Sequence, residues 1–430
     1  MPVVTLPGAP DLLGLHCADP SRYPFLLQTL GDSGWDILFA FPQPPGVQSA
    51  SPFFAVLDDE WKKAARPYSE NIDLPFRGGW FVYAGYELLH ELEPSVSPRT
   101  LEDDFPLGMM VRVPAALMVD RRQQRTYLFA EPEYAECLDV MRADLSNAPP
   151  VPDGSVHVTN LAEEDGELFL HGVSRIKEYI REGDVFQVNL ARRWQGELSS
   201  GSAAQLYARL RRSNPSPFAG IADFGRHQIV SSSPERLVRV RDGIIETRPI
   251  AGTHPRSADP REDERLRQDL MASPKERAEH IMLIDLERND LGRICQPGSV
   301  EVDELMAVCS YAHVHHIESN VRGRLRPEVT PGEVLHALFP GGTITGCPKV
   351  RTMQIIRELE ASPRYAYTGS MGYLNHDGSM DLNILIRTFM LNGRQLSFKA
   401  GAGIVADSDP DRELNETRAK AKGLLKALES

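Results

Sequence analysis

Apolar residues after position 160 recur at two spacings, and the longer spacing predicts a helix. Phe169, Val173, Ile176 and Ile180 fall at i, i+4, i+7 and i+11, which places them on one face of an α-helix. Gly183 follows them, and glycine readily adopts the left-handed backbone that ends a helix. The sequence therefore predicts an amphipathic helix that ends at Gly183.

Between residues 218 and 249 the apolar runs are short and are separated by turn residues. This pattern predicts successive strands at 218–224, 227–233 and 235–249, with turns at Gly225-Arg226 and Asp242-Gly243.

The other periodic segments mix helices and strands without the regular βαβ order of a parallel sheet. They predict helices from Ser273, from about Thr352 and from about Pro410 to the C-terminus, and strands at 78–89, 125–130, 370–391 and 394–405. Such a mixture favours an α+β fold over a doubly wound sheet.

A stretch rich in proline and glycine, from Ser146 to Ser155, interrupts the periodic pattern. It divides the chain into an N-terminal α+β region at 1–150 and a larger region at 160–430. We expect the two regions to form one compact body.

The charge balance and the cysteines exclude several classes of protein. A formal net charge of −13 over 430 residues argues against a nucleic-acid or anionic-membrane partner, since both need a basic face. The five cysteines never form a C-x-x-C pair and predict neither a zinc site nor a disulfide framework. The first residues lack the features of a signal peptide, and no segment approaches the ~18 apolar residues of a membrane helix. We expect a soluble, cytoplasmic protein.

A first pair of carboxylates lies on the helix predicted from Ser273. Glu276 follows Ser273 by three residues, which is typical of a helix capping box, and Glu279 lies on the same face. Glu279 is followed by a run of apolar residues that should be buried, and a carboxylate at the border of a core needs a cation or a metal as partner.

A second pair, Glu413 and Glu416, lies on the last predicted helix in one stripe with Lys420. Taken alone, this stripe describes a surface helix with a Glu416–Lys420 ion pair. If the two helices face each other, four carboxylates converge, which suits a hard cation such as Mg²⁺.

Two glycine-rich segments offer backbone N–H groups to an anion. The loop at 341–346, which contains Thr345, leads into a predicted helix, and Gly401 and Gly403 follow a predicted strand. Neither segment matches a nucleotide-binding motif.

Three further side chains are candidates for chemistry. Glu235 at a strand edge is a plausible general acid, and Arg387 in an otherwise apolar strand is suited to hold an anion. The histidines at 313, 315 and 316 lack a fourth metal ligand nearby, so a titrating or hydrogen-bonding His316 is favoured over zinc, with a purely structural histidine as the alternative. The set suits a small polycarboxylate substrate.

Several motifs resemble, in order, those of the chorismate-utilising enzymes. They are RPIAGTHPR, SPKERAEH with DLERNDLGR, HVHHI, GGTITGCPKVR, YTGSMGYL, DLNILIRT, GAGIVADS and ELNETRAKAKGLL, and the resemblance as a whole covers essentially all of Glu167 to Leu428. The family includes component I of anthranilate synthase and of aminodeoxychorismate synthase, and the isochorismate and salicylate synthases. The resemblance implies a two-sheet α+β body with a cleft for chorismate and Mg²⁺.

The resemblance also implies roles for individual residues. Glu279 and Glu416 match direct Mg²⁺ ligands, and Glu276 and Glu413 match neighbours that bind the ion through water. The residues that match the binding site for the substrate's carboxylates are Tyr367, Arg387, Gly403 and Lys420, and the substrate-lining backbone includes Ala251, Gly252, Thr345 and Gly401. Glu235 matches the acid that assists departure of the ring C4 hydroxyl, and Thr253 and His316 match residues around that leaving group.

The family that the chain resembles divides into branches whose enzymes use different nucleophiles and form different products. Members that add water carry a lysine where this chain has Gln187, so we infer that ammonia is the nucleophile. The 430 residues contain no recognisable glutaminase module, so a separate glutamine amidotransferase subunit would supply the ammonia.

Within the ammonia branches, aminodeoxychorismate synthase is favoured. GGTITG, LPFRGG and the short N-terminal half resemble that enzyme. Ala251 favours anthranilate synthase instead, because many aminodeoxychorismate synthases carry at that position a lysine that attacks ring C2. Anthranilate synthase is also favoured by the segment SYAHVHHIESNVRGRL. A paralogue that binds chorismate or an amidotransferase without turnover is a third possibility, against which the intact carboxylates argue.

Overall fold

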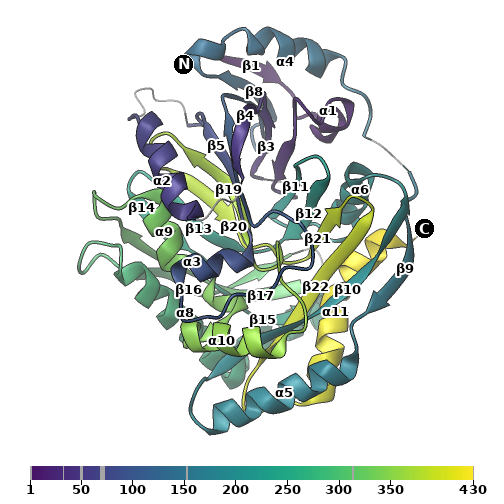
Figure 1. The fold of residues 1–430 in the computed structure, drawn as a ribbon, viewed down its shortest axis with the longest axis vertical. Helices are drawn as coiled ribbons and strands as arrows, with labels where there is room; N and C mark the ends of the chain where they lie inside the picture. The colour runs from purple at the N-terminus through teal and green to yellow at the C-terminus, as the bar shows by residue number, and fades with distance from the viewer. Residues whose placement is uncertain are drawn as a thin grey trace.

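Two large antiparallel sheets form the core of the protein, which confirms the predicted α+β fold with a two-sheet core flanked by helices (Figure 1). The computed structural model describes residues 2–31, 33–48, 52–67, 73–151, 154–311 and 314–429, and of these the side chains of residues 44–48 and of Thr253 are outside the description. His313 lies outside the described residues.

Twelve of the described strands form the first sheet, in the order β1-β8-β7-β3-β2-β11-β12-β21-β22-β10-β18, with β9 paired to β10. They are β1 (Val3–Pro7), β2 (Phe25–Gln28), β3 (Trp35–Ala40), β7 (Ala115–Asp120), β8 (Arg125–Ala130), β9 (His157–Glu163), β10 (Gln187–Ser200), β11 (Phe218–Asp223), β12 (His227–Ser233), β18 (Gly346–Cys347), β21 (Thr388–Asn392) and β22 (Gln395–Ile404).

The second sheet has ten described strands in the order β15-β17-β14-β13-β20-β19-β5-β6-β4, with β16 paired to β17. They are β4 (Gln43–Gln48), β5 (Gly79–Ala84), β6 (Gly108–Val113), β13 (Arg236–Arg241), β14 (Ile244–Thr247), β15 (Ile250–Pro255), β16 (Glu301–Ser310), β17 (Val314–Arg324), β19 (Ser370–Asn375) and β20 (Met380–Asn383).

The helices cover the outer faces of the sheets. They are α1 (Leu13–Ala18), α2 (Phe53–Ala64), α3 (Leu89–Leu92), α4 (Cys137–Ser146), α5 (Gly166–Arg181), α6 (Ala203–Ser213), α7 (Pro260–Ala272), α8 (Pro274–Gly292), α9 (Pro331–Leu338), α10 (Lys349–Leu359) and α11 (Pro410–Leu428), with short 3₁₀ turns η1 (Tyr86–Leu88), η2 (Pro132–Tyr134) and η3 (Gly342–Ile344). The predicted helices are present, and α10 begins at Lys349, earlier than expected, directly after Pro348 at its N-cap.

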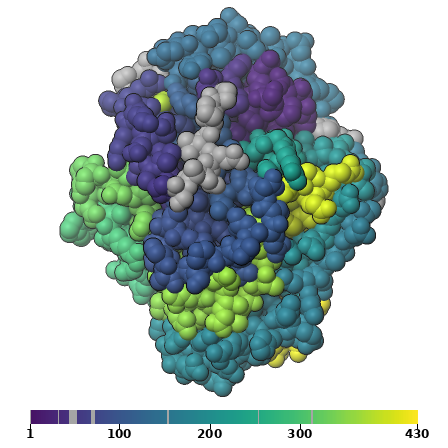
Figure 2. All heavy atoms as spheres, viewed as in Figure 1, coloured from purple at the N-terminus to yellow at the C-terminus, as the bar shows by residue number. Residues whose placement is uncertain are grey.

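Strands from the first 150 residues extend both sheets of the rest of the chain. In the first sheet β2 pairs with β11, with Leu26 opposite Ile221, and in the second β5 pairs with β19, with Phe81 opposite Tyr373. Figure 1 shows the purple and blue strands of this region running alongside teal and yellow-green strands. Figure 2 shows the blue segment lying over the yellow-green one, consistent with the hydrogen bonds that the Arg357 side chain donates to the carbonyl groups of residues 97 and 98.

Aromatic side chains fill the space between the two sheets. Phe25 of β2 stacks on Phe81 of β5 with ring centroids 4.1 Å apart, and Phe39, Phe76 and Phe129 are also fully or almost fully buried there. Burial of each such ring stabilises the fold by about 1.5–3 kcal/mol.

Two stretches of chain leave one sheet and enter the other, and they do so side by side. The chain passes from β12 in the first sheet to β13 in the second, and from β20 in the second to β21 in the first. The amide of Ile384 donates to the carbonyl of Glu235 at 3.0 Å, and the amide of Ser232 donates to the carbonyl of Arg387 at 3.1 Å. The two crossings therefore form one junction.

Candidate active site

The junction of the two sheets brings together the predicted acid and the predicted anion-binding arginine. Glu235 lies between β12 and β13, and Arg387 lies between β20 and β21. The expectation that Arg387 belongs to a continuous strand is wrong, because the strand breaks there and Arg387 adopts φ +52°.

Glu235 is buried and keeps its proton at neutral pH. Loss of hydration raises the pKa of its carboxyl to about 8, and the charges of Glu287 and Glu318 add to the increase, while the nearby Thr343 hydroxyl opposes it. A carboxylic acid with this pKa can donate a proton to a departing oxygen near pH 7.

Arg387 is half-buried, and no described residue forms an ion pair with its guanidinium. No carboxylate of the described chain forms an ion pair or a hydrogen bond with it, although Glu235 lies near enough that its ionised form would raise the pKa of Arg387. Burial lowers its pKa, yet arginine stays protonated at any physiological pH. A half-buried cation without a carboxylate partner in the described part of the chain is suited to bind an anion.

Strand β15 carries the residues predicted to line the substrate. Gly252 adopts φ +68°, and a Cβ atom there would lie 3.0 Å from Oε2 of Glu276, so the position requires glycine. The bulge at Gly252 lets its carbonyl meet Nδ1 of His316 on β17 at 3.1 Å. Ala251 is buried opposite Ile317, and Thr253 pairs with His316 through its backbone while its side chain is outside the description.

His316 lies close to the same junction. Burial lowers the pKa of its imidazole to about 4, and the positive charge of Arg387 contributes to this decrease. The ring is therefore neutral at physiological pH and acts through hydrogen bonds. His315 points to other partners, Ser310 at 2.8 Å and Asp263 at 3.1 Å.

Glycines in β22 let three polar side chains approach one another. A Cβ at Gly401 would lie 2.7 Å from Oδ1 of Asn189 and 3.0 Å from the hydroxyl of Tyr367, and one at Gly403 would lie 2.4 Å from Nε2 of Gln187. The Tyr367 ring is buried, and loss of hydration raises the pKa of its phenol, which stays protonated and can donate to a carboxylate.

The Thr345 hydroxyl holds its own loop together. It donates to the carbonyl of Gly341 at 2.9 Å and is fully buried, while the Thr345 carbonyl accepts from the amide of Asn189 at 2.9 Å. These bonds fix η3 against β10, beside the glycines of β22.

The carboxylate pair of α8 lies at the edge of the same space. Ser273 caps the helix by accepting a hydrogen bond from the Glu276 amide at 3.3 Å. Oε1 of Glu279 accepts from Nε2 of Gln187 at 2.9 Å, and Oε1 of Gln187 has no partner among the described residues. Burial and the charge of Glu276 raise the pKa of Glu279.

The second carboxylate pair, Glu413 and Glu416, lies on α11. Burial and the charge of Glu416 raise the pKa of Glu413, while Glu416 and Lys420 are half exposed and form an ion pair at 2.8 Å. The Glu416–Lys420 ion pair predicted for a surface helix is therefore present, and Lys420 points toward Glu416.

A divalent cation fits the donor chemistry of these two pairs. In the described part of the chain no three acidic, histidine or cysteine side chains converge closely enough to hold a metal ion. The charges of Lys275 on α8 and Lys420 on α11 nevertheless act on both Glu279 and Glu413, so the two helices approach each other here. A hard cation would neutralise the like charges of these carboxylates.

Sequence reasoning missed a second buried acid, Glu287 of α8. Burial raises its pKa to about 7, with a contribution from Asp290, and its carboxyl interacts with Thr247 and the Gly342 amide. The helical spacing of Glu287 with the buried residues Leu283 and Leu291 could have identified it.

A cavity of about 410 Å³ lies elsewhere, and its lining contains none of the predicted site residues. Gln28, Arg236, Tyr373 and Asp381 are among the residues around it. The acid, the arginine and the carboxylate pairs therefore belong to a different part of the molecule. No helix among the described ranges is long and apolar enough to span a membrane.

A protonated acid and an unpaired arginine at one junction indicate an enzyme that acts on a small anionic substrate. The chain belongs to the chorismate binding enzyme family, whose sequence model matches residues 45–426. The resemblance seen in the motifs is thereby confirmed, and the protein is a chorismate-utilising enzyme.

Relatives carry the names of two enzymes. An anthranilate synthase component I-like protein of Synechocystis sp. is 43% identical over 361 residues, which are 83% of this chain and 74% of that protein. Aminodeoxychorismate synthase component 1 of Bacillus subtilis is 49% identical over 266 residues, 62% of this chain and 56% of that protein. The crystal structure of anthranilate synthase component I from Streptococcus pneumoniae is 31% identical, with a TM-score of 0.78 over 99% of this chain and 92% of that one.

Proposed function

We propose that the protein is component I of an aminodeoxychorismate synthase, which converts chorismate and ammonia to 4-amino-4-deoxychorismate for the synthesis of p-aminobenzoate and folate. The observation that carries the proposal is the protonated Glu235 beside the unpaired Arg387. Together they offer a proton and a carboxylate-binding cation at one junction.

In this proposal Glu235 donates its proton to the C4 hydroxyl of chorismate, which leaves as water. Arg387 and Tyr367 bind a carboxylate of the substrate, since both are donors without a carboxylate partner in the described chain. Neutral His316, held by the Gly252 carbonyl, lies beside the leaving group and donates or accepts a hydrogen bond.

Glu276, Glu279, Glu413 and Glu416 would hold Mg²⁺, which supplies positive charge to bind a second carboxylate of the substrate. Lys420 is within electrostatic reach of Glu279 and Glu413 and would assist there once its exposed pair with Glu416 is exchanged.

Ammonia as the nucleophile is supported by Gln187. Its amide is bonded to Glu279 and cannot deprotonate water as a lysine base would. The named relatives are first components of synthases, which supports a separate amidotransferase subunit as the source of ammonia.

Anthranilate synthase component I is the second candidate. Ala251 is buried at the edge of the site and offers no nucleophile for ring C2, and several relatives are named anthranilate synthase component 1. The aminodeoxychorismate assignment is supported by the motifs GGTITG and LPFRGG and by the Bacillus subtilis relative.

One assay separates the candidates. The purified chain is incubated with chorismate, Mg²⁺ and an ammonium salt at alkaline pH, and the products are resolved by chromatography and fluorescence. A product that becomes p-aminobenzoate only after addition of a lyase supports the proposal, and direct appearance of anthranilate overturns it in favour of the second candidate.

Two controls complete the assay. Omission of the ammonium salt should stop chorismate consumption, and formation of isochorismate in its absence would overturn the choice of nucleophile. Binding of chorismate without consumption under any of these conditions would favour a non-catalytic paralogue.

A further inference from the structure

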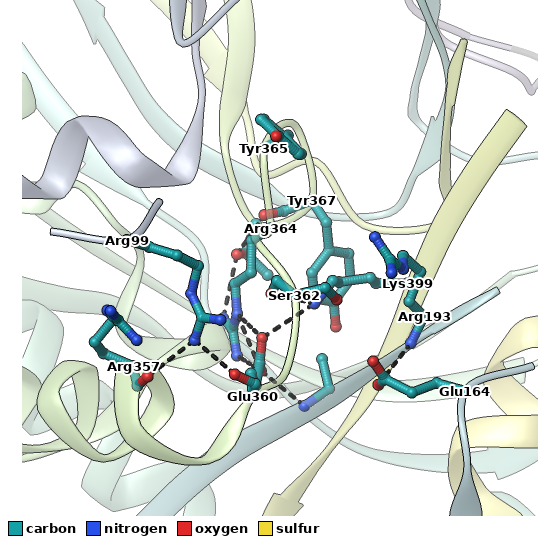
Figure 3. A network of polar contacts seen from close by, with 12 residues as sticks. Arg99, Glu164, Arg193, Arg357, Glu360, Ser362, Arg364, Tyr365, Tyr367 and Lys399 are labelled. Carbon is teal, nitrogen blue, oxygen red and sulfur yellow. Dashed lines mark hydrogen bonds and ion pairs between the residues drawn. The ribbon is translucent and has the colours of Figure 1, made fainter. Parts of the chain in front are cut away.

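A buried network of charges lies directly behind Tyr367. Glu360 follows α10, Arg364 lies four residues later and Lys399 belongs to β22, and each side chain is at most 2% exposed. Nη2 of Arg364 lies 2.5 Å from Oε1 of Glu360, and Nζ of Lys399 lies 3.3 Å from Oε2 of the same carboxylate. Figure 3 shows the three side chains pointing toward one another, with Tyr367 beside them.

The network contacts three segments that border the site. Arg364 donates to the carbonyl of Ile344 in η3 at 3.1 Å and to that of Asn189 in β10 at 2.8 Å. Glu360 accepts from the amide of Ala191, also in β10, at 2.9 Å. Apolar side chains of the same volume would stabilise the fold as well as these buried charges do. The charges are therefore better explained by the positions in which they hold the contacted segments.

The segment that carries Tyr367 is conformationally strained. Tyr365 has φ +48° and Thr368 has φ +62°, so non-glycine residues adopt the left-handed conformation on both sides of Tyr367. Glu87 holds the start of this segment by accepting from the amides of residues 364 and 365 at 2.7 and 2.8 Å. Such a conformation persists only when its surroundings enforce it.

Arg364 holds the other end of the strained segment. Its Nη1 donates to the Thr368 hydroxyl at 3.2 Å, and that hydroxyl donates to the Tyr367 carbonyl at 2.5 Å. The guanidinium carbon also lies 5.6 Å from the centroid of the Tyr367 ring, whose hydroxyl reaches Gly401. One side chain thus contacts the Tyr367 ring, the hydroxyl that holds the Tyr367 carbonyl, and the loop at η3.

We propose that Arg364, anchored by Glu360 and Lys399, is a positioning residue that holds Tyr367, η3 and β10 in the arrangement that binds a carboxylate of the substrate. The inference rests on the proposed function of this site, in which Tyr367 binds that carboxylate. Arg364 itself is buried behind the site and acts through Tyr367.

The test compares chorismate affinity in matched variants, measured by isothermal titration calorimetry so that the product formed does not matter. Arg364→Lys keeps the charge and loses the bonds to Ile344 and Asn189, and Tyr367→Phe removes the hydroxyl. We expect each to raise the Kd for chorismate roughly tenfold, and the double variant to raise it no further than the larger single effect. Additive effects, or an unchanged Kd in Arg364→Lys, would overturn the inference.

Arg121→Lys is the matched control, because Arg121 also makes two bonds to a buried carboxylate, that of Asp36 at 3.0 and 2.5 Å, within the N-terminal strands. It should lower the thermal midpoint without changing the Kd for chorismate. Thr368→Val, which is nearly isosteric and breaks the link from Arg364 to the Tyr367 carbonyl, serves if Arg364→Lys does not fold. A Kd in Thr368→Val equal to that of the wild type would also refute the positioning role.

The same titrations separate failure of this inference from failure of the proposed function. A wild-type chain that does not bind chorismate contradicts both. A wild-type chain that binds chorismate while the variants bind equally well contradicts only the role of Arg364.

Discussion

Glu235 keeps its proton because burial at the two sheet crossings removes its hydration, and no cation among the described residues bonds to it. Glu287 and Glu318 both add negative charge near it, and burial also lowers the pKa of the neighbouring Arg387. The acid and the anion-binding residue therefore have separate roles instead of forming an ion pair with each other.

Glu235→Gln should reduce kcat by about 10²–10⁴-fold, because the amide fills the same volume and cannot donate a proton to the departing hydroxyl. The measurement is ammonia-dependent chorismate consumption at saturating substrate, with thermal unfolding as the control for folding. Retention of more than a tenth of the wild-type rate would remove Glu235 from the role of acid.

The pH dependence of the rate should report the same carboxyl. Since the pKa of Glu235 is raised to about 8, the rate at a constant concentration of free NH₃ should fall as pH rises above that value. His316, with a pKa near 4, should contribute no change between pH 6 and 9. A flat profile above pH 8 would contradict the assignment.

Stability gives an independent measure of that pKa. The folded chain holds the Glu235 proton between the ordinary pKa near 4.5 and about 8, whereas the unfolded chain releases it, so this group lowers the free energy of unfolding as pH rises through that window. Glu235→Gln should remove this decrease, and urea unfolding at pH 5, 7 and 9 compares the two proteins. A constant difference between them at all three pH values would contradict the raised pKa.

At the scale of elements, α8 and α11 each carry a carboxylate pair, and the charges of Lys275 and Lys420 act on one member of each pair. Glu279 is held by Gln187 of β10, and Glu413 is buried near Ser408, so the inner member of each pair is fixed by the body of the protein. The outer Glu416 is exposed and free to exchange Lys420 for another cation.

Glu279→Gln should weaken Mg²⁺ binding at least tenfold and abolish Mg²⁺-dependent turnover, because a neutral amide replaces a charged oxygen ligand. Calorimetric titration with MgCl₂ in the presence of chorismate measures binding directly, apart from activity. Glu178→Gln, on the exposed face of α5, is the matched control and should change neither the Mg²⁺ affinity nor the Mg²⁺-dependent turnover. Unchanged Mg²⁺ affinity in Glu279→Gln would remove this residue from the metal site.

At the scale of the whole molecule, the two sheets are continuous across the first 150 residues and the rest of the chain. Phe25 and Phe81 stack between them, one ring from each sheet. A substitution that disrupts this aromatic packing should therefore destabilise both regions.

Phe81→Ala should lower the free energy of unfolding by about 3–5 kcal/mol, the usual result of emptying a buried aromatic site. Because strands of both regions pair in each sheet, near-ultraviolet and far-ultraviolet circular dichroism should report one common midpoint. Two separate transitions would show that residues 1–150 unfold independently of the larger region.

The amino-acid sequence by itself determined the helices, the class of fold and the identity of most candidate residues, because periodicity, capping residues and motifs are local. Phe169 to Ile180 predicts α5 in this way, and Ser273 predicts the start of α8. Predictions from the sequence were wrong where the backbone departs from a regular helix or strand, as at Arg387.

Only the tertiary structure decided which of these residues meet. The paired sheet crossings place Glu235 beside Arg387, although 152 residues separate them in the chain (387 minus 235). Long-range pairing also buries Glu287 and sets Arg364 behind Tyr367, and it leaves Lys420 at the surface with Glu416. Burial and the approach of distant charges set a carboxyl's pKa and a cation's availability, and both depend on contacts that no local pattern contains.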